Sequence, residues 1–187
     1  MHPKYFQFIT LTKNSNDCIY SLISEVLNYQ IHLFFLSFIK ETTAMSHELF
    51  MRKALEEAAF AAEEGEIPVG VLITCKGKII ARAHNQTERL QDVTAHAEMI
   101  AITMATAALG GKYLNECTLY VTLEPCTMCA GAIAWAQLGE LVYGASDPQR
   151  GYKRLSPPVL HPRTKVTGGI LETECSQLVK KFFQEKR

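Results

Sequence analysis

The chain has 187 residues, a length that favours one domain with a modest appendage and argues against a second full domain. Hydrophobic residues make up 48% and charged residues 20% of the chain, values typical of folded domains, which argues against disorder, collagen-like repeats and coiled coil. The formal net charge is zero, so the chain as a whole does not have the composition of a strongly basic nucleic-acid binder.

The charges are distributed unevenly along the chain. Residues 45–144 hold 7 basic and 12 acidic side chains, a net charge of −5, whereas residues 145–187 hold 9 basic and 4 acidic side chains, a net charge of +5. A basic C-terminal stretch of this kind indicates an anionic partner near that end of the protein.

Residues 1–44 lack the turn signals and the hydrophobic periodicity of the chain that follows. Ile19–Ile39 is 21 residues long, which is enough to cross a bilayer, but it contains Glu25 and further polar side chains. A signal peptide is poorly supported as well, because no small-residue cleavage site stands in the right place. We therefore expect no membrane partner. We interpret residues 1–44 as an extension from an upstream start, with Met45 as the biological start; a loosely attached N-terminal helix is the alternative.

From Met45 onward, hydrophobic periodicity predicts the order helix, hairpin, helix, strand, helix, strand, helix. Two β-rich runs separated by Lys76 and Gly77 predict a tight hairpin, and an Ala-rich run with Thr94 as candidate N-cap predicts the second helix. The expected ranges, in chain order, are Leu49–Ala62, Ile67–Cys75, Lys78–His84, Ala95–Leu109, Cys117–Leu123, Cys126–Leu138, Leu141–Tyr143 and Leu171–Gln184.

This order of elements predicts an α/β protein with a mixed central sheet flanked by helices, a three-layer α/β/α fold. The stretch Ala145–Val166 is rich in proline and basic residues, and we expect it to be irregular and exposed. The domain is expected to span residues 45–187.

The candidate chemistry lies at the starts of two predicted helices. Cys126 and Cys129 are three residues apart, so both sulfurs leave the same face of a helix and can bind one ion. His96, at the start of the preceding helix, completes a His-Cys-Cys set that leaves the fourth position of a tetrahedral zinc ion open. An open position indicates catalysis, and zinc suits thiolates with imidazole best.

Glu98 is the candidate proton carrier. It lies two residues after His96, about 200° round the helix, so the pair is poorly placed to chelate one ion. A carboxylate facing a zinc-activated water can take its proton and deliver it to a leaving nitrogen. Taken alone, Cys-x-x-Cys is as readily a redox pair or part of a structural zinc site, but the combination favours a catalytic centre.

Two runs of the sequence carry a family resemblance. Thr94–Glu98 (TAHAE) and Tyr120–Ala132 (YVTLEPCTMCAGA) closely resemble the zinc-dependent deaminases, specifically the bacterial tRNA-specific adenosine deaminases. The likeness extends from about Phe50 to the C-terminus, through Gly65–Gly70 and Ala83–Asn85. The implied fold is the cytidine-deaminase-like arrangement of a mixed sheet between helices.

The resemblance implies a function and a set of site residues. A zinc-activated water is expected to attack C6 of a flipped adenine at the wobble position of the tRNA anticodon arm, releasing ammonia and forming inosine. The protein is then a cytoplasmic homodimer with one Zn²⁺ per subunit. By this resemblance His96, Cys126 and Cys129 hold the zinc, Glu98 shuttles protons, Asn85 hydrogen-bonds the nucleoside, and Ile67, Pro68 and Val69 line the base pocket.

The C-terminal third departs from the family pattern. Ser146–Pro158 does not align with the segment that leads to anticodon contacts in the family, so those contacts are not carried over. Basic residues nevertheless lie next to aromatic residues in the sequence, a pattern typical of proteins that bind single-stranded nucleic acid. The candidate RNA-binding residues are Arg150, Tyr152, Lys153, Arg154, Lys181, Phe182 and Phe183; a solvated basic loop and a helix that packs by its phenylalanines are the alternative.

Several interpretations stay open at this stage. A free-base or nucleoside deaminase, such as guanine deaminase, shares the metal motif. A non-catalytic zinc-containing RNA-binding module is a third possibility, against which the presence of Glu98 argues. The apolar helix with Met128, Ile133 and Trp135 is a candidate dimer surface, and packing of these residues in the core is the alternative.

Overall fold

The structure is a computed structural model, and it describes residues 29–32 and 47–186. The chain divides into two units, Met1–Thr43 and Ala44–Arg187. In the first unit, residues 29–32 form a helical turn with exposed side chains, and the rest of the stretch 19–39 lies outside the described residues. Among the described helices, none has both the length and the hydrophobicity needed to cross a membrane.

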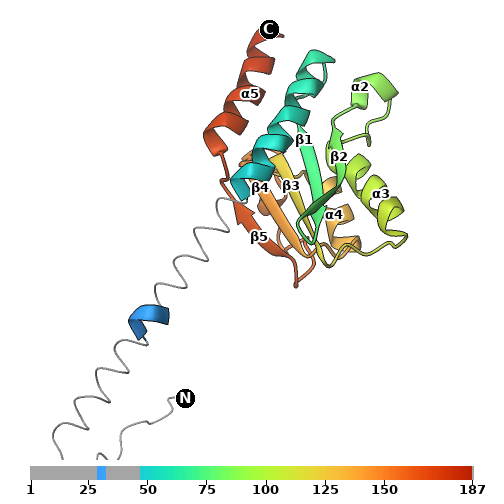
Figure 1. The fold of residues 1–187 in the computed structure, drawn as a ribbon. Helices are drawn as coiled ribbons and strands as arrows, with labels where there is room; N and C mark the ends of the chain where they lie inside the picture. Colours follow the sequence, from blue (N-terminus) through green and yellow to red (C-terminus); the bar gives the residue numbers. More distant parts are fainter. Residues whose placement is uncertain (1–28, 33–46, 187) are drawn as a thin grey trace, which may run out of the picture. The chain divides into compact units, whose positions relative to one another are not determined.

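The second unit contains a five-stranded sheet and several helices (Figure 1). The strands are β1 (Gly70–Cys75), β2 (Lys78–His84), β3 (Cys117–Leu123), β4 (Glu140–Ala145) and β5 (Lys165–Gly168). The helices are one over residues 47–63, α2 (Thr87–Leu90), α3 (Ala97–Leu109), α4 (Thr127–Trp135) and α5 (Glu172–Glu185), with a 3₁₀ turn at Tyr152–Arg154.

The sheet is mixed, as the sequence predicts. Its strand order is β2-β1-β3-β4-β5. β1 runs antiparallel to β2 and to β3, whereas β3, β4 and β5 are parallel to one another. β1 and β2 form the predicted tight hairpin, in which Cys75 is paired with Lys78.

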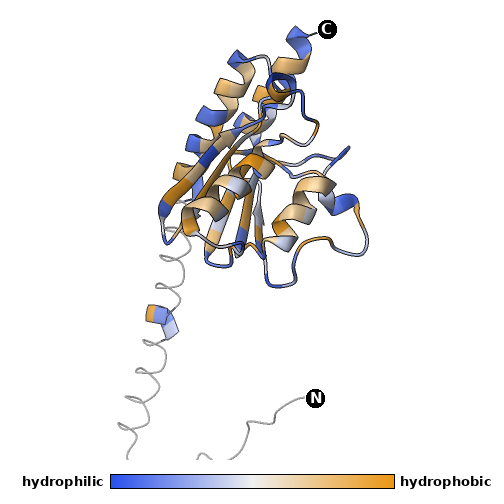
Figure 2. Ribbon diagram, turned by 90° about the vertical axis from the view of Figure 1, so that its right-hand side faces the viewer, coloured by the Kyte–Doolittle hydropathy of each residue, from blue (hydrophilic) through white to orange (hydrophobic). Residues whose placement is uncertain are grey.

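Alternating residues of the central strands build two separate cores. On β1, Val71 and Ile73 belong to a core with residues of α3 and α4, whereas Leu72 belongs to a second core with residues of the 47–63 helix and α5. This alternation follows from the two-residue period of a strand, which sends successive side chains to opposite faces. Figure 2 shows hydrophobic residues along most of the sheet. The predicted three-layer α/β/α architecture is confirmed.

Gly70 allows the 47–63 helix to lie directly against the start of β1. A Cβ atom at this position would overlap the carbonyl oxygen of Ala54 and the backbone nitrogen of Ala58. Any side chain at residue 70 would therefore push the helix away from the sheet.

Several elements differ from the sequence prediction. β1 begins at Gly70 rather than Ile67, because Pro68 has no N–H and the Val69 N–H donates to the Ile67 carbonyl at 2.7 Å in a tight turn. The short helix α2 and the edge strand β5 were not predicted. β5 is mostly exposed, so it lacks the apolar alternation by which a strand is recognised in a sequence.

Candidate metal centre and active site

Two helix N-termini bring the candidate metal ligands together. His96 is the N-cap of α3 and Cys126 is the N-cap of α4, both with extended backbone angles, while Cys129 lies in the first turn of α4. Neither N-cap residue gives its own helix a side-chain cap hydrogen bond. The predicted N-cap, Thr94, instead donates through its N–H and its hydroxyl to Asp92 Oδ1 at 2.8 and 2.7 Å, so α3 begins two residues later than expected.

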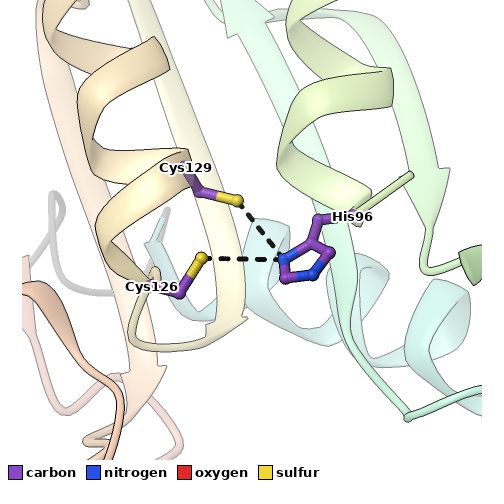
Figure 3. A group of neighbouring side chains, drawn as sticks. All are labelled: His96, Cys126 and Cys129. Atoms are coloured by element: carbon purple, nitrogen blue, oxygen red, sulfur yellow. Dashed lines mark hydrogen bonds between the residues drawn. The ribbon is translucent and has the colours of Figure 1, made fainter. Parts of the chain in front are cut away.

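The three ligand atoms converge on one point (Figure 3). Nδ1 of His96 lies 3.7 Å from Sγ of Cys126 and 3.5 Å from Sγ of Cys129. A tetrahedral zinc ion with ordinary Zn–S and Zn–N bond lengths holds its nitrogen and sulfur ligands about 3.6 Å apart, so the side chains fit that ion. Within the described residues, no fourth His, Cys, Asp or Glu joins this group, which leaves one position of such an ion open.

The thiols of Cys126 and Cys129 have very different pKa values. A hydrogen bond with Cys129 lowers the pKa of Cys126 to about 4, and His96 acts in the same direction against the effect of burial. The same hydrogen bond and burial raise the pKa of Cys129. The positive end of α4 favours thiolates at this position, so the pair is suited to bind a cation.

Glu98 is buried beside the sulfurs, with 4% of its surface exposed. Burial raises its pKa to about 7, and the negative charge of Cys126 adds to this effect, whereas a hydrogen bond with Cys129 opposes it. The pKa of His96 is raised, first of all by its contact with Cys126. A carboxyl group that titrates near neutral pH can both accept and donate a proton in the same reaction cycle.

Asn85 is held next to this centre by backbone and side-chain hydrogen bonds. Its Nδ2 donates to Oε2 of Glu66 and to Oγ1 of Thr87, both at 3.0 Å. The next residue, Gln86, donates its N–H to the carbonyl of Ala95, directly before His96, at 3.0 Å. The amide nitrogen of Asn85 is thus engaged within the protein, and its Oδ1 is the atom suited to accept a hydrogen bond from a ligand.

Glu66 organises the surroundings of Asn85, a role that sequence reasoning missed. Its fully buried carboxylate also accepts the hydroxyl of Thr87 at 3.2 Å and the N–H of Arg89 at 2.8 Å. Burial opposes ionisation, but these hydrogen bonds, together with one from the N–H of Glu88, outweigh it and lower the pKa of Glu66. The position of Glu66 directly before the apolar run that begins at Ile67 was the available signal.

The three expected base-pocket residues lie between Glu66 and β1. Pro68 is buried, Ile67 is 36% exposed, and Val69 packs in part against the core on the α3 side. The carbonyl of Val69 accepts the N–H of Asn85 at 3.1 Å, which fixes this segment beside the residue that we expect to bind the nucleoside. Their contact with a base stays a prediction.

The candidate RNA-binding residues of the 147–154 segment fall into two groups. Arg150, Lys153 and Arg154 are exposed. Tyr152 is 8% exposed and belongs to the core on the α3 side, and burial raises its pKa to about 12. The expectation that its ring stacks on RNA bases is therefore corrected, because the ring fills the protein interior.

The candidates on α5 divide in the same way. Phe182 is 8% exposed, so the expected stacking role does not fit it either, whereas Phe183 is 47% exposed and meets Phe182 edge to face. Lys181 pairs with Glu185 one turn later at 3.8 Å on the exposed side of the helix. Phe183 and Lys181 are the members of this group that remain available to a partner.

The apolar helix that the sequence offered as a dimer surface has both buried and exposed side chains. Ile133 is fully buried in the core and Met128 is half-buried. Trp135, the last residue of α4, is 86% exposed.

The fold and this centre together define a deaminase. The family model of the MafB19-like deaminases matches residues 45–187, and the chain belongs to this family. It is thus an enzyme of the hydrolase class rather than a non-catalytic binding module.

The comparisons also confirm the particular resemblance. The chain is 46% identical to a tRNA-specific adenosine deaminase of Agrobacterium fabrum over 143 residues, which cover 74% of this chain and 94% of the relative. A solved structure from studies of A-to-I editing by tRNA:A34 deaminases at the wobble position of transfer RNA matches with a TM-score of 0.65 and 44% identity, over 69% of this chain and 97% of the other. A guanine deaminase structure from Nitrosomonas europaea matches with a TM-score of 0.60 and 25% identity, over 72% and 83%.

Proposed function

We propose that the protein hydrolyses adenosine to inosine at the wobble position of the tRNA anticodon, with residues 45–187 as the catalytic domain. The observation that carries this proposal is the convergence of His96, Cys126 and Cys129, with buried Glu98 beside them, in a chain 46% identical to a tRNA-specific adenosine deaminase. The substrate is the anticodon arm, whose single-stranded loop allows a base to be turned out of the stack.

His96, Cys126 and Cys129 would hold one zinc ion per subunit. Two thiolates and an imidazole are the donor set that zinc prefers, and the 3.5 and 3.7 Å spacings suit its bond lengths. When bound, zinc supplies a Lewis acid that lowers the pKa of water towards neutrality.

Glu98 moves the protons of the reaction. Its carboxylate takes a proton from the attacking water, whose oxygen forms the new bond to C6, and delivers a proton to the amino nitrogen as the C6–N bond breaks. One water proton thus ends on the departing ammonia and the other on ring nitrogen N1. A pKa of about 7 allows Glu98 to act in both directions near neutral pH.

Asn85 and the segment Ile67–Val69 would orient the nucleoside. The Oδ1 of Asn85 accepts a hydrogen bond from the nucleoside, because its Nδ2 is already engaged with Glu66 and Thr87. The apolar atoms of Ile67, Pro68 and Val69 then contact the face of the base.

The assembly we propose is a homodimer that works in the cytoplasm, where its tRNA substrate is made. The 86% exposed Trp135 supports an interface at the end of α4, because a large exposed aromatic ring gains most from burial in a complex. Sedimentation of the protein and of a Trp135→Ser variant tests this surface: we expect the variant to shift towards the monomer.

The experiment that tests the reaction compares RNA with small substrates. Purified protein is incubated with an anticodon stem-loop that has adenosine at the wobble position, and inosine is detected by sequencing as a change from A to G. Free adenosine and free guanine are assayed in parallel, and Glu98→Gln serves as the isosteric control. Turnover of guanine with an unedited stem-loop would refute the proposal.

Guanine deamination is the second candidate, because the fold also matches guanine deaminase structures. The guanine deaminase structures are 25% identical over 72% of this chain or 41% identical over 54% of it, against 44% over 69% for the tRNA:A34 deaminase structure, so identity and coverage together favour the RNA substrate.

A further inference from the structure

Glu124 is a buried carboxylate that the reaction does not use. It follows β3 directly, stands two residues before Cys126, and is 5% exposed. Its Oε2 accepts the N–H of Asp147 at 3.2 Å, and its Oε1 accepts the N–H of Lys153 at 3.1 Å. One side chain therefore holds both ends of the loop 147–153.

Gly151 lies directly on this carboxylate. A Cβ atom at Gly151 would lie 2.5 Å from Cδ and Oε1 of Glu124 and 2.5 Å from the carbonyl oxygen of Asp147. The Gly151 N–H also donates to that Asp147 carbonyl at 3.0 Å. The loop is thus folded around the carboxylate, with no room for a side chain between them.

The same loop contacts the turn that presents the metal ligand. Gly151 forms an isolated antiparallel bridge with Cys126, and the N–H of Tyr152 donates to the carbonyl of Pro125 at 3.0 Å. Arg150, which precedes Gly151, is thereby held close to the edge of the active site.

The loop also carries the local positive charge. Arg150, Lys153 and Arg154 are exposed, and the one acidic residue of the loop, Asp147, uses its Oδ1 to accept the N–H groups of Gln149 and Arg150. The Nζ of Lys153 is bound to the hydroxyl of Tyr143, and Nη1 of Arg154 donates to the carbonyl oxygen of Gln149, which leaves the other N–H groups of this guanidinium for a ligand. The arginines are the cations that remain suited to phosphate groups, because a guanidinium binds them in a fixed fork geometry.

We propose that Glu124 is a positioning residue that fixes the 147–153 loop against the Cys126 turn, so that Arg150 and Arg154 meet the RNA phosphates flanking the target adenosine. This inference rests on the proposed tRNA function. A loop that is already ordered loses less conformational entropy on binding, so the effect of Glu124 falls on RNA affinity.

The first test is Glu124→Gln in the full-length protein. The amide keeps the shape of the side chain but accepts one N–H instead of two, so one end of the loop is released. We expect the KM for the anticodon stem-loop to rise about tenfold, in line with the loss of one hydrogen bond to a charged group, while kcat stays within about twofold and the zinc content is unchanged. Glu116→Gln, at an exposed carboxylate paired with Lys76, is the matched control and should leave both constants unchanged.

A double-mutant cycle separates positioning from general damage. In a background with Arg150→Ala and Arg154→Ala, Glu124→Gln should raise KM by less than about twofold, because its effect acts through these arginines. Gly151→Ala, which pushes the loop off the carboxylate, is a second variant that should reproduce the KM effect if Glu124→Gln folds poorly.

The outcomes distinguish the inference from the proposed function. Loss of zinc or a fall in kcat without a change in KM would assign Glu124 to the metal-ligand turn and overturn the inference. An unchanged KM in Glu124→Gln, or full additivity in the cycle, would overturn it as well. If the wild-type protein does not edit the stem-loop at all, the proposed function fails first, and the inference fails with it.

Discussion

Replacing Glu66 by glutamine removes a buried charge from the network that holds Asn85. The carboxylate accepts hydrogen bonds from Asn85, Thr87 and the backbone N–H of Arg89, at 3.0, 3.2 and 2.8 Å. The glutamine amide offers one accepting oxygen and one donating nitrogen, so at least one of these donors faces another donor. A buried donor left without an acceptor costs about 1–3 kcal/mol, and we expect the free energy of unfolding to fall by that amount at pH 7.

The pH dependence of this loss follows from the lowered pKa of Glu66, whose ordinary value is 4.5. A carboxyl whose pKa is lower in the folded state binds fewer protons there than in the unfolded chain, so it stabilises the fold above pH 4.5. The contribution disappears as the pH falls below 4.5 and through the folded pKa. The difference between wild type and Glu66→Gln should thus be constant from pH 7 down to about 5.5 and shrink below pH 4.5.

Urea unfolding at a series of pH values measures this difference. Because zinc release at low pH affects both proteins, the comparison between them cancels it. Glu63→Gln, at an exposed position on the 47–63 helix, is the control and should change stability by less than about 0.5 kcal/mol at every pH. A difference between wild type and Glu66→Gln that stays the same from pH 7 to pH 3.5 would refute the assignment of an ionised, hydrogen-bonded Glu66.

Three further outcomes are expected. Glu98→Gln should lower kcat by at least about 10³-fold while zinc content and thermal unfolding stay close to wild type; an active variant would remove Glu98 from proton transfer. Removal of metal by a chelator should abolish activity and lower Tm by at least about 5 °C, and added zinc should restore both; a chelated protein with wild-type Tm would exclude Cys126 and Cys129 as ligands of a tightly held ion. Gly70→Ala should lower the free energy of unfolding by about 1–3 kcal/mol in urea, because its Cβ overlaps the backbone of the 47–63 helix, and a neutral effect would show that the helix moves away freely.

The sequence was sufficient where the signal is local. Hydrophobic periodicity predicted the mixed sheet between helices, and the spacing of Cys126 and Cys129 predicted that both sulfurs share one face. The positions of His96 and Glu98 at the start of one helix predicted them in the same centre, as the family resemblance also implied, and the structure places all four side chains there. These features depend on residues within one element, or on a motif whose spacing the chain preserves.

The sequence was insufficient where the partner of a residue lies far along the chain. Glu66 and Glu124 resemble ordinary acidic residues in the sequence, because the N–H groups they accept come from positions about 20 to 30 residues later. Tyr152 stands among cations and was taken as exposed, although the bridge of Gly151 to Cys126 turns its ring into the core. Long-range pairing of this kind has no periodic signature.

The N-cap positions of α3 and α4 show a conflict between stability and activity. A serine, aspartate or asparagine at residues 96 and 126 would accept a backbone N–H in the first turn of each helix and stabilise it by about 1 kcal/mol. The imidazole and the thiol found there make no such cap hydrogen bond. A more heat-stable variant of this enzyme must therefore keep two helix N-termini without a capping side chain. Because these two side chains would hold the zinc, replacing them would exchange about 1 kcal/mol of capping per helix for the loss of the ion, so added stability has to come from other parts of the fold.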